Sequence, residues 1–124
     1  SKAIRSSDNI YCYLWLMDTY EEAQLRCKRL GGRLPQVNNQ AMLAFLEETV
    51  LQKIDEVIWI DLATEGPIEI SAATNKPLKG FDRPPIIPLE HQPGSIIHWF
   101  CMNQWIGIDA NPKAQHGIVI VWDA

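Results

Sequence analysis

The sequence predicts a single α+β domain, in which two helices flank antiparallel strands. Three features of the 124 residues indicate this fold. Helical spacing with start and stop signals occurs twice in the first half, strand-like apolar runs lie near both ends, and five of the eight prolines fall between Lys76 and Gly94. A chain of this length buries roughly two thirds of its unfolded surface, so residues 1–124 are expected to form one domain.

The first predicted helix begins after Thr19 and ends before Gly31. Thr19 can accept a hydrogen bond as the N-cap, and Glu22, three residues later, completes a capping box. Gly31 and Gly32 allow the chain to leave through a left-handed turn. Apolar residues three and four positions apart should face the core. They are Tyr20, Ala23, Cys27 and Leu30.

The second predicted helix covers residues 40–52, with Asn39 as its cap. Its spacing places Glu47 and Glu48 toward water. The side chains expected on its buried side are Met42, Phe45, Leu46 and Val50.

Aliphatic and aromatic runs bounded by turn residues predict six strands. They cover residues 10–16, 57–62, 68–70, 96–101, 105–108 and 117–122. Trp59 is assigned to the core.

The capped helix with Thr19-Tyr20-Glu21-Glu22-Ala23, then Cys27, Gly31-Gly32 and the strand Trp59-Ile60-Asp61-Leu62, resembles the N-terminal half of a C-type lectin-like domain. That family usually reads Thr-Trp-Glu-Glu-Ala, Cys, Gly-Gly and Trp-Ile-Gly-Leu at these places. The match covers about half of the chain, with a looser similarity in residues 63–101. The resemblance implies that the first and last strands pair. The run Gly31-Gly32-Arg33-Leu34-Pro35 and the shortage of cysteines look more like the bacterial invasin and intimin type of this fold.

Three cysteines cannot all pair within one chain. We expect Cys27, on the inward helix face, to bond to Cys101 at the end of a strand, which leaves Cys12 as the odd thiol. The resemblance implies the same helix-to-strand bridge, and the chain-entropy model values it at about 3–5 kcal/mol. The alternative is three buried reduced thiols, because free cysteine packs as a small hydrophobe.

The proline-rich segment excludes a helix and most sheet pairing, so it predicts a long, stiff loop. The resemblance places the ligand-binding long loop of the fold here, and we expect residues 82–95 and 102–109 to carry the contacts. The alternative is a proline-stiffened surface connection. The candidate ligand-binding residues are Asp82, Arg83, Glu90, His91, Gln92, Asn103, Gln104, Trp105 and Asp109. Trp105 is either an exposed anchor or one more buried aromatic.

His91-Gln92-Pro93-Gly94 is similar to the Gln-Pro-Asp triplet with which sugar-binding members of the family hold calcium and a hexose. Gly94 lacks the carboxylate, and no Trp-Asn-Asp triplet follows Cys101. Calcium takes six to eight oxygen ligands, so Glu90 and Gln92, with Asp109 and Asn111 as distant substitutes, are too few. We therefore expect no required metal, and calcium-dependent carbohydrate binding is an alternative.

A net charge of −4 argues against nucleic-acid binding, and no apolar run approaches the roughly 20 residues of a membrane-spanning helix. The N-terminus lacks the apolar stretch of a signal peptide, so the chain is either intracellular or a mature or excised piece. The scattered histidines form no zinc pair, and no cysteine lies beside a cationic cluster, so no catalytic residue is expected. The resemblance, together with this lack of catalytic residues, implies a non-enzymatic recognition module, extracellular or on the cell surface, that binds a protein receptor as an adhesin does. A structural or assembly subunit is a further alternative.

Overall fold

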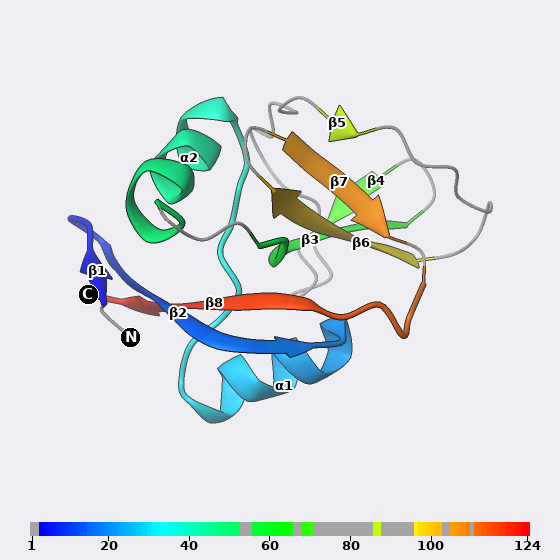
Figure 1. Cartoon of the computed structure of the whole chain (residues 1–124), viewed down its shortest axis with the longest axis horizontal. Coiled ribbons are helices and arrows are strands. Elements are labelled where there is room, and N and C mark those ends of the chain that lie inside the picture. The colour runs from blue at the N-terminus through cyan, green and yellow to red at the C-terminus, as the bar shows by residue number, and fades with distance from the viewer. Residues whose placement is uncertain are drawn as a thin grey trace.

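The computed structural model describes residues 3–52, 56–65, 68–70, 86–87, 96–102, 105–109 and 111–124, and the side chains of residues 3–52, 56–62, 100–101 and 111–124. Two helices and one sheet make up this part of the chain (Figure 1). The helical segments are α1 (Tyr20–Arg29), α2 (Gln40–Phe45) and the π-helical turn η1 (Leu46–Val50). The strands are β1 (Ile4–Arg5), β2 (Asn9–Asp18), β3 (Ile58–Glu65), β4 (Ile68–Ile70), β5 (Ile86–Ile87), β6 (Ile96–Met102), β7 (Trp105–Asp109) and β8 (His116–Asp123). None of the helices in these ranges is long and apolar enough to cross a membrane.

The strands form one mixed sheet in the order β1-β2-β8-β3-β6-β7-β5, and β4 pairs with β3. Strands β2 and β8 pair antiparallel from Asn9 opposite Asp123 to Asp18 opposite His116. The predicted pairing of the first and last long strands is therefore confirmed. The sheet departs from the antiparallel prediction at two short contacts, because β3 meets β8 and β5 meets β7 in parallel.

Helix α1 begins with the predicted capping box. The Thr19 hydroxyl accepts a hydrogen bond from the Glu22 N–H at 3.3 Å, and a Glu22 carboxylate oxygen accepts one from the Thr19 N–H at 3.1 Å. Tyr20 and its two partners on the predicted face are buried, but Leu30 is 52% exposed. Leu30 is the C-cap, and the chain turns away immediately after it at Gly31, whose φ is +77°. The helical spacing therefore no longer applies at Leu30.

Helix α2 begins at the predicted cap, where Asn39 Oδ1 accepts a hydrogen bond from the Met42 N–H at 2.9 Å. Its last turn widens, since the Leu51 N–H donates to the Leu46 carbonyl, five residues earlier. Met42 is exposed, contrary to the prediction, and its Sδ accepts a hydrogen bond from the Asn38 N–H at 3.3 Å. The buried residues are Leu43, Leu46 and Val50, which repeat at ordinary helical spacings of three and four.

Glu47, predicted to face water, is half-buried in η1. Its Oε1 is completely buried and has no hydrogen-bond partner among the described residues. Burial raises the pKa of the Glu47 carboxyl, and the neighbouring Glu48 raises it further. The ionised form of Glu47 is thus disfavoured in the folded chain.

We expect Glu47→Gln to raise the free energy of unfolding at neutral pH by up to about 1 kcal/mol, because it removes a charge from a partly buried, unpartnered position. A folded-state pKa above the unfolded value means that the wild type loses stability as pH rises through these two values. The gain from the substitution should be complete above the raised pKa and should disappear below the ordinary glutamate value of about 4.3. Urea unfolding of both proteins across this pH range measures the difference. Glu48→Gln, at an exposed site on the same turn, removes only the weaker of the two causes that raise the Glu47 pKa, so we expect a smaller gain there, and an equal gain would contradict the dominant role of burial.

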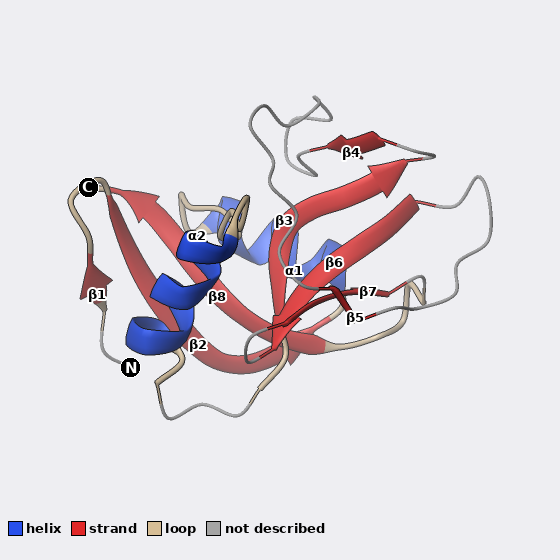
Figure 2. Cartoon of the chain, turned by 90° about the horizontal axis from the view of Figure 1, so that it is seen from above, coloured by secondary structure: helices blue, strands red, loops and turns tan. Residues whose placement is uncertain are grey.

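The sheet separates two hydrophobic cores, with α1 on one face and α2 on the other (Figure 2). Side chains alternate between them along each central strand, so Ile58 and Ile60 face α2 while Trp59 faces α1. The α1-side core consists of Tyr20, Ala23, Cys27, Leu34, Trp59, Phe100, Ile118 and Ile120. The α2-side core consists of Tyr13, Val37, Leu43, Leu46, Val50, Leu51, Ile58, Ile60, Leu62, Cys101 and Val119.

The predicted bridge between Cys27 and Cys101 is absent, and both residues are free thiols. Cys27 lies in the α1-side core and Cys101 in the α2-side core, so the sheet itself stands between them. The prediction that Cys27 lies on a helix and Cys101 on a strand is correct. The two side chains, however, lie on opposite faces of the sheet. Cys12, predicted as the odd thiol, is half-buried in β2 and its Sγ lies 3.7 Å from the Tyr13 carbonyl oxygen.

Candidate functional site

Most of the predicted ligand-binding residues lie outside the described part of the chain. This holds for Asp82, Arg83, Glu90, His91, Gln92, Asn103 and Gln104. The other two, Trp105 and Asp109, are the first and last residues of β7, where the structure describes the backbone. The contacts predicted for their side chains, and the exposure of Trp105, remain predictions.

The described parts of the two predicted contact segments meet at one edge of the sheet. Strand β5, inside the proline-rich segment, pairs with β7 through Ile86 opposite Ile106 and Ile87 opposite Gly107. Strand β7 in turn pairs with β6, with Trp105 opposite Met102. We call Ile86–Ile87 and Trp105–Asp109 the β5–β7 edge. It lies on the opposite side of the molecule from both termini (Figure 1).

The two-residue strand β5 qualifies the prediction that prolines exclude most pairing in this segment. Proline lacks the N–H that a strand ladder requires, and Ile86–Ile87 lie between Pro85 and Pro88. Both isoleucines keep their N–H groups, so a ladder of this length can form between the prolines. This pairing holds the proline-rich segment against β7.

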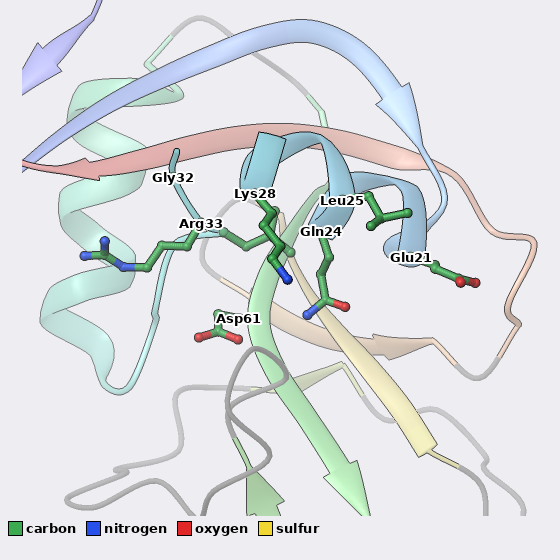
Figure 3. A pocket seen from close by; sticks show the side chains of 8 residues that line it. Glu21, Gln24, Leu25, Lys28, Gly32, Arg33 and Asp61 are labelled. Carbon is green, nitrogen blue, oxygen red and sulfur yellow. The ribbon is translucent and has the colours of Figure 1, made fainter. Parts of the chain in front are cut away.

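A second candidate site is a groove of about 450 Å³ beside α1 (Figure 3). We call it the α1 groove. Its lining residues are Glu21, Gln24, Leu25, Lys28, Gly32, Arg33, Leu34 and Asp61.

Asp61 lines the groove from β3 and is only 4% exposed. It occupies the place at which the resemblance expects glycine, within the Trp-Ile-Asp-Leu strand. Its N–H donates a hydrogen bond to the Pro35 carbonyl at 2.8 Å, so β3 leaves its regular pairing with β6 here. Figure 3 shows the Asp61 side chain projecting from β3, below Arg33 and the end of α1 in this view.

The charges of the α1 groove are balanced. Glu21 and Asp61 are acidic, whereas Lys28 and Arg33 are basic. The Arg33 guanidinium is already engaged, since it donates to Asn9 at 3.1 Å and pairs with Asp123 at 2.9 Å. Such a groove produces no field of a single sign that would concentrate a charged ligand.

No nucleophile with an adjacent base appears among the described side chains of the α1 groove, which include no serine, threonine, cysteine or histidine. The buried cysteines nearby are not activated either. Burial raises the pKa of Cys27 to about 11, and it raises the pKa of the fully buried Cys101 as well. Both are protonated thiols at neutral pH, whereas a nucleophilic cysteine requires a lowered pKa.

The sequence patterns did not predict the α1 groove. The available signal was the position of Asp61 inside a run of buried apolar residues, Trp59 to Leu62, where a charged residue calls for an explanation.

The lectin C-type domain family model matches residues 17–80, more than half of the 124 residues. The chain belongs to this family. The predicted C-type lectin-like fold is therefore confirmed, and the β5–β7 edge and α1 groove are surfaces of a C-type lectin domain. Among curated proteins, no sequence matches the chain.

Solved C-type lectin-like structures superimpose on nearly the whole domain. The mouse scavenger receptor C-type lectin carbohydrate-recognition domain has a TM-score of 0.77 at 12% identity, covering 98% of this chain and 95% of its own. Human lithostathine has a TM-score of 0.75 at 18% identity, covering 98% and 88%. A calcium-independent type II antifreeze protein has a TM-score of 0.75 at 12% identity, covering 98% and 92%. At these identities the likeness concerns the fold.

The fold is that of a recognition module. Among the residues whose structure is described, no group of three histidine, cysteine, aspartate or glutamate side chains is arranged to hold a metal ion.

Proposed function

We propose that this C-type lectin domain is a non-enzymatic recognition module that binds a protein receptor, in an extracellular or cell-surface setting, without a required metal. The contacts come from residues 82–95 and 102–109. Asp82, Arg83, Glu90, His91, Gln92, Asn103, Gln104, Trp105 and Asp109 are the side chains we assign to the ligand.

The observation that carries this proposal is the pairing of β5 with β7. It joins two segments separated in sequence into one continuous edge, as a contact surface requires. The edge also lies away from both termini, so a partner can approach it without meeting the ends of the chain. An adhesin of the invasin and intimin type would use its tip domain in this way.

The absence of an enzyme activity is part of the proposal. The buried thiols have raised pKa values, and the α1 groove offers no acid, base and nucleophile in the roles that hydrolysis or group transfer needs. Balanced charge in the α1 groove also gives no preference for a phosphorylated or acidic substrate.

The residues present do not fit a calcium site of the family type. The candidate oxygen donors are Glu90, Gln92, Asp109 and Asn111, with glycine at 94 in place of the acid. This set falls short of six to eight oxygen ligands. The calcium-independent antifreeze protein is a precedent for this fold without the ion.

We therefore expect 5 mM calcium chloride to leave the melting temperature within about 1 °C of its value in EDTA. A ligand present at 100 times its dissociation constant that binds only the folded state would add about 2.7 kcal/mol of stability, which thermal melting detects easily. A calcium-specific rise that magnesium does not reproduce would support the calcium-dependent lectin alternative.

Receptor binding is tested by adhesion of beads that carry the domain to a panel of cell surfaces. We expect Trp105→Ala to reduce adhesion at least tenfold if Trp105 is an interface anchor, and Gln24→Ala in the α1 groove to leave it unchanged. Protease treatment of the cells should abolish adhesion and EDTA should not. Loss with EDTA together with competition by free sugars would favour a carbohydrate ligand. Lack of adhesion together with a stable oligomer in light scattering would favour the assembly subunit.

A further inference from the structure

The second half of β2 carries two large apolar side chains at the surface. Tyr13 is buried in the α2-side core, but the next residues in the alternating pattern, Trp15 and Met17, are 66% and 48% exposed. Leu14 and Leu16, in between, pack on the α1-side core. Helix α2 lies over the first half of β2 (Figure 1).

Trp15 is held in an unfavourable backbone conformation. Its φ is +57°, the one positive value among the described non-glycine residues. It lies in a bulge, where the pairing with β8 shifts between Tyr13 and Met17. A bulky side chain in the left-handed region is a true outlier, and an exposed indole recovers little of that cost through burial. Folding stability alone does not explain a tryptophan here.

The exposed indole is nevertheless well supported. The Tyr13 ring packs edge-on against it, with 4.8 Å between ring centroids and 73° between planes. Tyr13 is itself fixed against β8, because its ring lies 3.1 Å from the place where a Cβ on Gly117 would be. Trp15 is thus presented on a rigid strand, which reduces the entropy lost when a partner binds.

An acidic residue lies close to the Tyr13–Trp15 pair. Glu56 is exposed and directly precedes Val57, whose carbonyl oxygen accepts a 2.7 Å hydrogen bond from the Gly117 N–H. This oxygen and the Tyr13 ring lie 3.2 and 3.1 Å from the same point, the place of a Cβ on Gly117, so Glu56 is next to the chain segment that contacts Tyr13. After burial, which is the larger cause, the Glu56 carboxylate raises the pKa of the Tyr13 phenol. A carboxylate beside an aromatic pair favours a cation, since the face of an indole also attracts positive charge. Tryptophan is the residue most enriched in interface hot spots, and methionine adapts to varied apolar surfaces.

We propose that Trp15, Met17 and Glu56 form a second contact surface, for a polypeptide partner whose arginine or lysine side chain stacks on the Trp15 indole beside Glu56. This surface, which we call the Trp15 surface, is separate from the β5–β7 edge and does not depend on the function proposed for that edge.

The test uses the whole ¹⁵N-labelled chain and two peptides, acetyl-Gly-Arg-Gly-amide and its neutral match acetyl-Gly-Gln-Gly-amide. At 0.15 M salt, we expect the arginine peptide to shift the indole N–H resonance of Trp15 saturably, in the millimolar range, and the glutamine peptide to leave it in place. The indole N–H groups of Trp59 and Trp122 serve as internal controls. They already donate hydrogen bonds within the fold, to the carbonyls of Asp18 and Leu30 respectively. Glu56→Gln should weaken binding about 1.5-fold to fivefold, as expected for loss of one favourable charge contact at a surface. No shift up to 20 mM, equal shifts with both peptides, or unchanged affinity in Glu56→Gln would overturn the proposal.

Trp15→Asn provides a second readout and assigns the Trp15 resonance. Asparagine tolerates a positive φ, so we expect the melting temperature to rise by about 2–6 °C while the response to arginine is lost. A fall of similar size would show that Trp15 serves the fold, and would overturn the assignment of a contact role.

Discussion

Replacing Trp59 by alanine should lower the free energy of unfolding by about 3–5 kcal/mol, a large part of the stability of a domain this size. Trp59 is 1% exposed at the centre of the α1-side core. Its ring lies 5.2 Å from Tyr20 and 4.3 Å from His116, measured between centroids. Its indole N–H donates a 2.8 Å hydrogen bond to the Asp18 carbonyl, which would lose that donor. Urea unfolding followed by circular dichroism measures the loss.

Trp122→Ala is the matched control. Its indole makes a hydrogen bond of the same length, 2.8 Å, to the Leu30 carbonyl, but the side chain is only half-buried. We expect this substitution to cost about 1–2 kcal/mol, so the difference between the two variants isolates the effect of complete burial. Equal losses would contradict the central position of Trp59.

Gly32→Ala should cost about 3 kcal/mol. A Cβ at this position would lie 2.7 Å from Ile120 Cγ1 and 2.7 Å from the Val121 carbonyl oxygen. The backbone cannot easily retreat, because Arg33 and Val121 exchange two hydrogen bonds of 2.9 and 2.8 Å at this point. Overpacking of this kind typically costs 1–3 kcal/mol, and the two hydrogen bonds add to it. Hydrogen exchange should become faster at the amides of Arg33 and Val121.

The neighbouring Gly31→Ala separates steric crowding from backbone strain. Gly31 has a φ of +77° but nothing within 4 Å of an added Cβ. We expect a loss of about 1 kcal/mol from the left-handed conformation alone, with normal exchange at Arg33 and Val121. A larger loss in Gly31→Ala than in Gly32→Ala would be inconsistent with the close contact to β8.

Local signals in the sequence predicted most elements of the fold. The cap of α1 at Thr19, the cap of α2 at Asn39 and the long strands all depend on residues near one another in the chain. Errors appeared where packing against distant parts of the chain decided the outcome. The inward face of α2 begins at Leu43 instead of Met42, and the face of the sheet on which Cys101 lies could not be read from its strand alone.

The candidate site was less predictable for the same reason. The two contact segments were predicted from a family resemblance. Their described parts, Ile86–Ile87 and β7, are joined by strand pairing, which the prolines of the segment made unexpected. The α1 groove brings together Lys28 on α1, Arg33 after it and Asp61 on β3, whose N–H bonds to the Pro35 carbonyl. No local pattern connects these positions. The conformation of Trp15 could not be predicted either, since a left-handed φ leaves no signature in the residue type.

The pairing of β2 with β8 also determines how the domain responds to mechanical load. Asn9 and Asp123 are paired at one end of this ladder, and the Ala124 N–H donates to the Asp8 carbonyl beside them. Pulling the two ends of the chain apart would therefore break the hydrogen bonds of this ladder one after another, starting at Asn9 and Asp123. Pulling one end against the distant β5–β7 edge would act along β2 and β8, and because antiparallel hydrogen bonds lie perpendicular to the strands, it would shear many of them at once. A module anchored by one end and held by a ligand at that edge would thus be loaded in its mechanically stronger direction.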